Sequence, residues 1–469
     1  MRRHFTEQTA IFFSVTKWMF LSSFIGVMIG AIVTVFLTIL HLAEAQRSSV
    51  PFHYYYLLPV ALVLTVWLVR TFAPSAEGHG TEKVIEAVHK QNGKIDIRVI
   101  PVKLLATLLT IFAGGSVGKE GPGAQIGAGA SSFISNILKF HKSDRKKLVI
   151  CGISAGFASV FGTPIAGAIF GVEVLVIGVI MYDVLLPSFV AGFAAFTTAQ
   201  FLGIKYTYFD LHFYQSVALD LPLILKVVLA GLFFGLVSDV VVTMVSWVHQ
   251  SIKKIPLHIY WKAFGGGVVL ILLTLIFGDE YLGLGLDTIK DTLDPNPAYT
   301  QSLPWYAFLL KSLFTSLTLG VGGSGGIITP LFYIGATSGH SFALLTGDSH
   351  IALFAALGFV SVLAGATNTP IAATIMAVEL FGIEIAHYAA LSVVISFLIT
   401  GHRSVFTSQI LAMRKSEMLE VKVGQEIEEA EVNLENHELN KIKNIRDKLQ
   451  KRRELLQKRR LEQRKNKKS

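Results

Sequence analysis

Residues 114–122 read Gly-Gly-Ser-Val-Gly-Lys-Glu-Gly-Pro, and residues 322–330, 208 positions later, read Gly-Gly-Ser-Gly-Gly-Ile-Ile-Thr-Pro. Apolar sequence flanks both stretches, and Glu120 is the only carboxylate in either copy. Glycine-rich breaks at matching positions of two hydrophobic halves are typical of the substrate site of membrane transport proteins. The pair therefore predicts a chain of two repeated halves that moves an ion, with its central site at the breaks.

A second pair of motifs supports the internal repeat. Residues 163–166, Thr-Pro-Ile-Ala, precede Glu173, and the same four residues recur at 369–372 before Glu379, at an offset of 206. Two motifs in the same order predict two related halves, although the sequence leaves open whether they are parallel or inverted. The predicted divisions are an N-terminal cytoplasmic segment 1–16, a first transmembrane repeat 17–203, a connector 204–220, a second transmembrane repeat 221–415 and a basic tail 416–469, with an extramembrane loop at 278–303.

The composition is that of a membrane protein, because 52% of the 469 residues are hydrophobic and only 16% are charged. Several nearly uncharged stretches are long enough to span or nearly span a bilayer. These stretches are residues 11–42, 57–69, 148–179, 223–248 and 352–378. Others are too short or too rich in glycine to cross upright, so we expect tilted, broken and re-entrant helices.

Positive charge is concentrated at the C-terminus. Residues 440–469 contain 14 Lys/Arg and 3 Asp/Glu, a net charge of +11, whereas the whole chain carries +9. The other residues therefore sum to −2, which argues against nucleic-acid binding by the body of the chain. With Arg2 and Arg3 at the other end, the positive-inside rule predicts that both termini are cytoplasmic. We expect a multi-pass protein of a bacterial-type inner (plasma) membrane.

The tail beyond residue 416 is rich in charge and in helix-favouring residues. We expect a solvated helix or a disordered segment, with no room for nucleotide-sensing domains. A short dimeric coiled coil is the alternative, because apolar residues between 442 and 456 match a heptad only in part. The Lys/Arg clusters would be attracted to anionic lipid headgroups of the cytoplasmic leaflet.

The glycine breaks favour the binding of an anion. A helix that begins inside the membrane presents unpaired N–H groups and the positive end of its dipole. Glycines let the backbone approach an ion closely, and prolines after the breaks fit the first turns of new helices. Glu120 places a negatively charged side chain of the protein at this break. Ionisable residues inside a membrane are candidates for function. The alternative is that Glu120 only pairs with a nearby Lys or Arg to hold the fold.

Four motifs in order resemble the CLC family of chloride channels and proton-coupled anion antiporters, over residues 15–412. Residues 118–122 are similar to the family's Gly-Lys/Arg-Glu-Gly-Pro gate motif, and residues 325–330 to its second anion-binding helix start. Residues 78–80, Gly-His-Gly, fall where the family has Gly-Ser-Gly at the inner mouth. Residues 401–406, Gly-His-Arg-Ser-Val-Phe, take the place of its last helix, near a central pore tyrosine. The resemblance implies an all-α integral membrane protein, an inverted-repeat homodimer with one pore per subunit.

The same resemblance implies roles for individual residues. Glu120 is the implied gate, and chloride or a similar small anion is the implied transported ion. The implied anion-binding residues are His79, Gly118, Lys119, Glu120, Gly121, Gly326, Ile327, Ile328 and Phe406.

Three positions near the implied pore depart from the family pattern. His79 replaces a serine, and since an imidazole titrates near neutral pH, anion affinity is expected to depend on cytoplasmic pH unless His79 lies outside the pore. Glu82 replaces a proline. Phe406 takes the place of the pore tyrosine, although Thr407 is the alternative at that position and Phe406 could instead serve only in packing.

The position of the proton relay also departs from the family's antiporters. Glu173 matches the first of two successive glutamates, and Val174 takes the place of the second, which relays protons. Valine cannot carry a proton, so passive, channel-like conduction gated by Glu120 is the prediction. A proton-coupled antiporter and, less favoured, a fluoride exporter are the alternatives. Glu173 and Glu379 are expected to be buried structural carboxylates that bind helix ends.

Other classes of function find little support in the sequence. No Walker loop and no polar catalytic cluster is visible, so we expect neither an enzyme nor a bound cofactor. His and Cys do not occur at metal-ligand spacing, and the lone Cys151 excludes an intramolecular disulfide. No arginine-rich helix of the voltage-sensor type is present, so the sequence fixes no voltage dependence.

Overall fold

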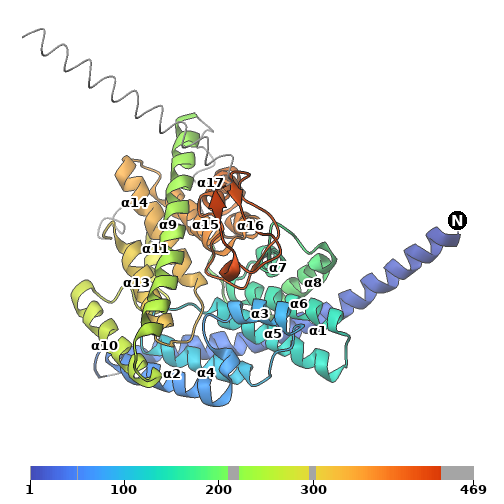
Figure 1. The fold of residues 1–469 in the computed structure, drawn as a ribbon, viewed down its shortest axis with the longest axis horizontal. Helices are drawn as coiled ribbons and strands as arrows, with labels where there is room; N and C mark the ends of the chain where they lie inside the picture. Colours follow the sequence, from blue (N-terminus) through green and yellow to red (C-terminus); the bar gives the residue numbers. More distant parts are fainter. Residues whose placement is uncertain (1, 50, 210–220, 295–302, 435–469) are drawn as a thin grey trace, which may run out of the picture.

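The computed structural model describes residues 2–49, 51–209, 221–294 and 303–434, and helices dominate it (Figure 1). The helices of the first half are α1 (Arg2–Ala45), α2 (Leu58–Phe72), α3 (Thr81–Lys90), α4 (Val99–Phe112), α5 (Glu120–Ile137), α6 (Lys142–Phe161), α7 (Pro164–Glu173) and α8 (Tyr182–Phe201). Those of the second half are α9 (Leu221–Lys254), α10 (Ile259–Phe277), α11 (Leu286–Leu293), α13 (Ala307–Gly320), α14 (Ile328–Thr346), α15 (Ile351–Thr367), α16 (Pro370–Phe381) and α17 (Ala386–Ile399). The strands are β1 (Val176–Ile177), β2 (Ile410–Leu411), β3 (Leu419–Glu420) and β4 (Asn433–Leu434).

Five helices of the described residues are long and apolar enough to cross a membrane. They are Thr6–Ala45, Tyr54–Phe72, Tyr182–Phe201, Leu221–Lys254 and Ile259–Phe277. Further apolar helices, among them α4, α7, α13, α15, α16 and α17, are shorter. The expected mixture of spanning and short or broken helices is therefore confirmed. The core lies among the short helices, with α5 packed on α6 and α14 packed on α15.

Two of the predicted long stretches are each divided into two helices. Residues 148–179 turn at Gly162 between α6 and α7, and residues 352–378 turn at Asn368 between α15 and α16. Both turning residues have a positive φ, 76° at Gly162 and 58° at Asn368, which ends a helix in a left-handed cap. A Thr-Pro pair follows each, and proline starts the next helix because the first turn needs no N–H donor. The two breaks are equivalent in the repeat.

The helices that follow these breaks cap one another. Glu173, at the end of α7, accepts hydrogen bonds from the N–H groups of Ile371 (3.0 Å) and Ala372 (2.8 Å) at the start of α16. Glu379 of α16 accepts from Ile165 (3.0 Å) and Ala166 (2.8 Å) at the start of α7. A carboxylate satisfies the unpaired N–H groups of a helix start and complements its dipole. The prediction that these two glutamates bind helix ends is confirmed, whereas the expected burial holds for Glu173 but not for Glu379, which is only partly buried.

We expect the substitution Glu379→Gln to destabilise the junction of α7 and α16. The amide replaces one accepting oxygen by a donor that faces an N–H group, so a hydrogen bond to a charged group worth about 1.5–3 kcal/mol is lost. Thermal unfolding of the detergent-solubilised protein should show a lower midpoint than the wild type. Asp287→Asn is the control, because the Asp287 side chain is 98% exposed. A Glu379→Gln midpoint equal to that of this control would contradict the expectation.

The structure corrects two expectations for segments outside the long helices. Residues 278–303 are not only a loop, because they contain α11 and bury Tyr281, Leu282 and Ile289. The segment from residue 416 to residue 434 is neither an α-helix nor disordered, because β3 pairs with β4 in an antiparallel sheet around a short 3-10 helix, Ile427–Glu429. The remainder of the basic tail, from residue 435, and residues 210–220 of the connector lie outside the described residues.

The C-terminal segment also returns to the first half. Strand β2 pairs in parallel with β1, which follows α7 in sequence. A small apolar cluster of Ile177, Phe397, Leu411 and Val421 fixes this return. Figure 1 shows the segment, in red, beside α7 and α16, while α5 and α3 lie at the centre of the molecule. Ser408 of this segment binds Glu82 at the start of α3, and Glu426 pairs with Lys90 at the end of α3.

Candidate functional site

The two glycine breaks pair directly with each other. The N–H of Gly118 donates to the carbonyl of Gly326 at 2.6 Å, and the N–H of Gly326 donates to the carbonyl of Gly118 at 2.6 Å. This antiparallel bridge joins equivalent residues of the two repeats, so the halves are related here by a local twofold axis. The approach requires glycine, because a Cβ at Gly326 would lie 2.7 Å from the backbone nitrogen of Gly121. Helices α5 and α14 therefore begin side by side.

Glu120 reaches from its own helix to the start of the other. Its Oε2 atom accepts a hydrogen bond from the N–H of Thr329 at 3.1 Å and a second from the Thr329 hydroxyl. The side chain is buried, with 1% of the residue exposed, and its Oε1 atom has no hydrogen-bond partner among the residues that the structure describes. The carboxylate thus occupies the N-terminus of α14, where an anion would be favoured.

The alternative structural role of Glu120, an ion pair with a nearby base, does not match these contacts. Its hydrogen bonds go to Thr329, which is neutral. Thr329 was missed as a partner by sequence reasoning, because the equivalent residue of the first repeat is Gly121. The only signal in the sequence was that Thr329 stands beside Pro330 in the matching break.

The Gly-His-Gly loop packs against the start of α5. A Cβ at Gly80 would lie 2.5 Å from the carbonyl oxygen of Gly121, and a Cβ at Gly121 would overlap the carbonyl oxygen of His79. The Nδ1 atom of His79 and the hydroxyl of Thr81 are enclosed without hydrogen-bond partners among the described residues. Unpaired buried polar atoms are rare, and they indicate a place for an ion or water.

Two buried lysines hold the loops around the site in matching ways. Lys103 donates through Nζ to the carbonyl of Gly78 at 2.6 Å, and Lys311, its repeat mate, donates to the carbonyl of Gly283 at 2.9 Å. Each also binds a second carbonyl two residues earlier, at Ala76 or Tyr281. The two lysines recur at the same offset of 208 as the glycine breaks. A lysine that recurs at the same place in two apolar helices was the available signal.

The segment with Phe406 differs from the expectation, because residues 401–409 form turns and not a last helix. The ring of Phe406 is fully buried. The next two residues both donate to the Oε1 atom of Glu82, Thr407 through its hydroxyl at 3.2 Å and Ser408 through its N–H at 3.0 Å and its hydroxyl at 2.6 Å. Glu82 therefore ties the Phe406 segment to the start of α3, close to His79.

The implied relay position holds no acid. Val174 is fully buried at the end of α7, and its carbonyl accepts a hydrogen bond from Nε2 of Gln409 at 2.8 Å. Both oxygens of the preceding Glu173 are engaged by the amides of α16. Neither residue presents a free carboxylate at this place.

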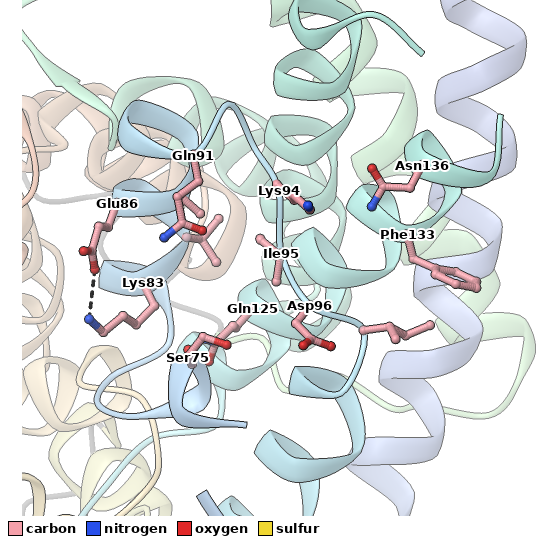
Figure 2. Close-up of a pocket in the computed structure, with 13 residues that line it drawn as sticks. Ser75, Lys83, Glu86, Gln91, Lys94, Ile95, Asp96, Gln125, Phe133 and Asn136 are labelled. Atoms are coloured by element: carbon pink, nitrogen blue, oxygen red, sulfur yellow. Dashed lines mark hydrogen bonds and ion pairs between the residues drawn. The ribbon is translucent and has the colours of Figure 1, made fainter. Parts of the chain in front are cut away.

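A cavity of about 430 Å³ is lined by α3, the loop after it and α5, and the paired glycines do not line it. Figure 2 shows Lys83 and Glu86 on its α3 side, Lys94 and Asp96 on the following loop, and Gln125 of α5 near Ser75. The amide nitrogen of Gln125 donates to the carbonyl of Ser75 at 2.9 Å, which links α5 to the segment just before the Gly-His-Gly loop. The cavity therefore lies next to the Gln125–Ser75 hydrogen bond that holds the segment before the Gly-His-Gly loop.

The arrangement at the centre can stabilise an anion without a metal ion. Lys119 and Ile327 are the N-cap residues of α5 and α14, and the paired glycines bring these two helix starts together. Helix α3 begins next to them, after Gly80. Unpaired N–H groups and dipoles of several helix starts favour negative charge at one place.

Comparisons with known proteins agree with this geometry. The chain matches the family model described as "Voltage gated chloride channel" over residues 60–401. It is 35% identical over 410 residues to a chloride/fluoride channel protein of Pseudomonas syringae pv. tomato, covering 86% of this chain and 88% of that protein. It is 26% identical to an H(+)/Cl(-) exchange transporter of Vibrio vulnificus, covering 77% of this chain and 81% of that protein.

A solved structure is similar over nearly its whole length. The crystal structure of a CLC-type fluoride/proton antiporter superimposes with a TM-score of 0.79 at 33% identity, covering 85% of this chain and 99% of the other. The relatives and the structure named above are transporters or channels by their descriptions. The chain belongs to the CLC family of membrane proteins that transport anions.

Proposed function

We propose that this protein conducts chloride or a similar small anion passively, with Glu120 as the gate. The observation that carries the proposal is the position of the Glu120 carboxylate, which lies on the N–H and hydroxyl of Thr329 at the start of α14. A permeating anion would compete for the same donors. When Glu120 is protonated or displaced, the helix start becomes free for the anion.

The proposed anion path runs between the starts of α3, α5 and α14. Backbone N–H groups around Gly118, Lys119 and Gly121 would serve it from the first repeat, and those around Gly326, Ile327 and Ile328 from the second. His79 and Phe406 would line the end of the path remote from the gate, which we call the His79 side. The unpartnered Nδ1 atom of His79 supports this assignment.

The assembly of the protein, its orientation and its lipid contacts are also part of the proposal. We propose a homodimer with one path per subunit and with both termini in the cytoplasm. We further propose that the basic tail contacts anionic lipid headgroups. The proposed His79 side is then the cytoplasmic side.

Passive conduction is favoured over proton coupling by the relay position. Val174 has no proton to exchange, and Glu173 is held by two amides of α16. A buried carboxylate with both oxygens bound is a poor proton carrier, because protonation would weaken its two hydrogen bonds. No second acid stands at the relay position.

Proton-coupled exchange of fluoride or chloride is the second candidate. Specific observations favour it, because the similar crystal structure is that of a fluoride/proton antiporter and the Vibrio vulnificus relative is an H(+)/Cl(-) exchange transporter. The Pseudomonas syringae relative is called a chloride/fluoride channel protein, which keeps fluoride as a candidate ion for either mechanism.

The test is anion efflux from proteoliposomes with the external pH recorded at the same time. We expect chloride efflux without linked proton movement, because the relay carboxylate is missing. Parallel vesicles loaded with fluoride compare the two ions under the same gradient. Glu120→Ala should keep anion flux in this case.

Stoichiometric proton uptake during efflux, abolished in Glu120→Ala, would contradict passive conduction and establish the antiporter. A fluoride efflux far faster than that of chloride would replace chloride as the proposed ion. Liposomes without protein, prepared in the same way, give the background leak of anions and protons that the measured fluxes must exceed.

A further inference from the structure

Glu82 is a carboxylate that the proposed conduction path does not yet use. It lies at the second position of α3, two residues after Gly80. Its Oε1 atom accepts hydrogen bonds from both the N–H and the hydroxyl of Ser408, and from the hydroxyl of Thr407. Its Oε2 atom is enclosed and has no partner among the described residues.

This arrangement repeats that of Glu120. In each case one Ser or Thr, Ser408 or Thr329, binds a carboxylate oxygen with both its N–H and its hydroxyl, and at Glu82 the Thr407 hydroxyl adds a third bond. In each case the second oxygen is buried and bare. A bare oxygen in an enclosed place favours the uptake of a proton, because the charged form is poorly solvated there. The two glutamates have the same chemistry at two places.

The bonds of Glu82 connect parts of the chain that are far apart in sequence. On one side stands the Gly-His-Gly loop, which continues directly into α3. On the other stands the Phe406 segment, whose turn is further fixed by the bond from the N–H of Val405 to the carbonyl of Ala366 at 2.9 Å. Glu82 therefore links the Phe406 segment to the helix that follows the Gly-His-Gly loop.

Few charged groups of the described residues lie around Glu82 and the His79 loop, and His249 of α9 is one of them. Lys83 is the neighbouring cation on α3, and it is paired with Glu86 at 2.9 Å. His79 precedes α3, with Lys103 behind its loop. On the C-terminal segment, Glu426 is paired with Lys90 at 2.9 Å, and the backbone N–H of Glu428 binds the carbonyl of Thr407. Helices α5 and α6, which also pack on α3, contribute Gln125 and Lys146 on their facing sides.

We propose that Glu82 is a second gate carboxylate, which holds the Phe406 segment across the His79 side while ionised and releases it when protonated. The proposal rests on the proposed anion conduction and adds its regulation by protons. Charge-assisted hydrogen bonds are about twice as strong as neutral ones, so protonation weakens all three bonds at Oε1 together. Acid on the His79 side then opens this end of the path.

The experiment uses the full-length protein in proteoliposomes, in a Glu120→Gln background. This background removes the gate at α14, so that any remaining dependence on pH belongs to the rest of the path. Chloride efflux is measured at equal internal and external pH, from about pH 8 to about pH 5. We expect acid to accelerate efflux by about tenfold, the effect of losing one strong hydrogen bond.

Adding Glu82→Gln should give the fast rate at every pH, because the neutral amide mimics the protonated acid. Ser408→Ala removes one hydroxyl donor and leaves the carboxylate, so it should also raise the efflux rate at neutral pH. If the Glu82→Gln protein cannot be incorporated into liposomes, Ser408→Ala tests the proposal in its place. Asp96→Asn is the control, because Asp96 lies on the loop after α3, pairs with Arg98 at 2.6 Å and lines the cavity of Figure 2. The control variant should show the same dependence of efflux on pH as the Glu120→Gln parent.

Three results would overturn the proposal. The first is a Glu82→Gln variant with the rate and pH profile of its parent. The second is acid acceleration that survives Glu82→Gln but disappears in His79→Ser, which would assign it to the imidazole. The third is an absence of anion efflux from the Glu120→Gln parent, which would overturn anion conduction as well, whereas the first two results leave conduction intact.

Discussion

Replacement of Glu120 by glutamine is expected to raise chloride efflux at neutral pH by about tenfold to a hundredfold. In the wild type a negative carboxylate holds the N–H and hydroxyl of Thr329, so an anion must displace a charge-assisted bond. The neutral amide binds the same donors more weakly and adds no negative charge at the helix start. Efflux from proteoliposomes under a fixed chloride gradient measures the effect.

Variants at Thr329 give this expectation a graded control. Thr329→Val removes the hydroxyl and keeps the N–H, so it should release Glu120 in part and raise efflux by less than Glu120→Gln. Asp287→Asn, at an exposed carboxylate far along the chain, should leave efflux unchanged. An efflux from Glu120→Gln at or below that of the wild type would show that Glu120 does not close the path.

The substitution Gly121→Ala is expected to abolish anion flux and to lower thermal stability. The added methyl group would overlap the carbonyl oxygen of His79 and would lie 3.0 Å from the Cα atom of Gly326. Both neighbours are backbone atoms, which cannot move aside as a flexible side chain can. The starts of α3, α5 and α14 would therefore be forced apart at the place where the proposed path runs.

Gly265→Ala is the matched control for this substitution. Gly265 lies within α10, and nothing stands within 4 Å of the position of a Cβ there. Alanine in an open helical site stabilises a helix by about 0.5–1 kcal/mol relative to glycine. Efflux assays and thermal unfolding of both variants distinguish the effects. Wild-type flux and stability in Gly121→Ala would refute the close packing described above.

The sequence by itself determined the features that depend on local signals. Left-handed turns followed by proline divide residues 148–179 and 352–378, because neither Pro164 nor Pro370 can continue the preceding helix. Glycine breaks at an offset of 208 identified the two places where helices begin inside the body of the protein. The repeat and its motifs were also enough to indicate the family.

Local signals did not predict every segment. The charged composition of residues 416–434 favoured a helix, yet β3 and β4 pair there because Val421 and its neighbours find an apolar cluster with Ile177 and Phe397. Residues 401–406 resembled the place of a helix, but Gly401 and the bonds of Ser408 to Glu82 hold them in turns. In both cases tertiary contacts outweighed the local preference of the backbone.

Only the tertiary structure decided which residues meet at the centre. The sequence placed Glu120 in the first break, but its partner Thr329 is 209 residues away and became visible only when the two breaks paired through Gly118 and Gly326. The bond between Glu82 and Ser408 spans 326 residues in the same way. Sequence spacing fixes neighbours along one helix, whereas the partners of a buried carboxylate are chosen by the packing of whole helices, which brings donors to it from the other half of the chain.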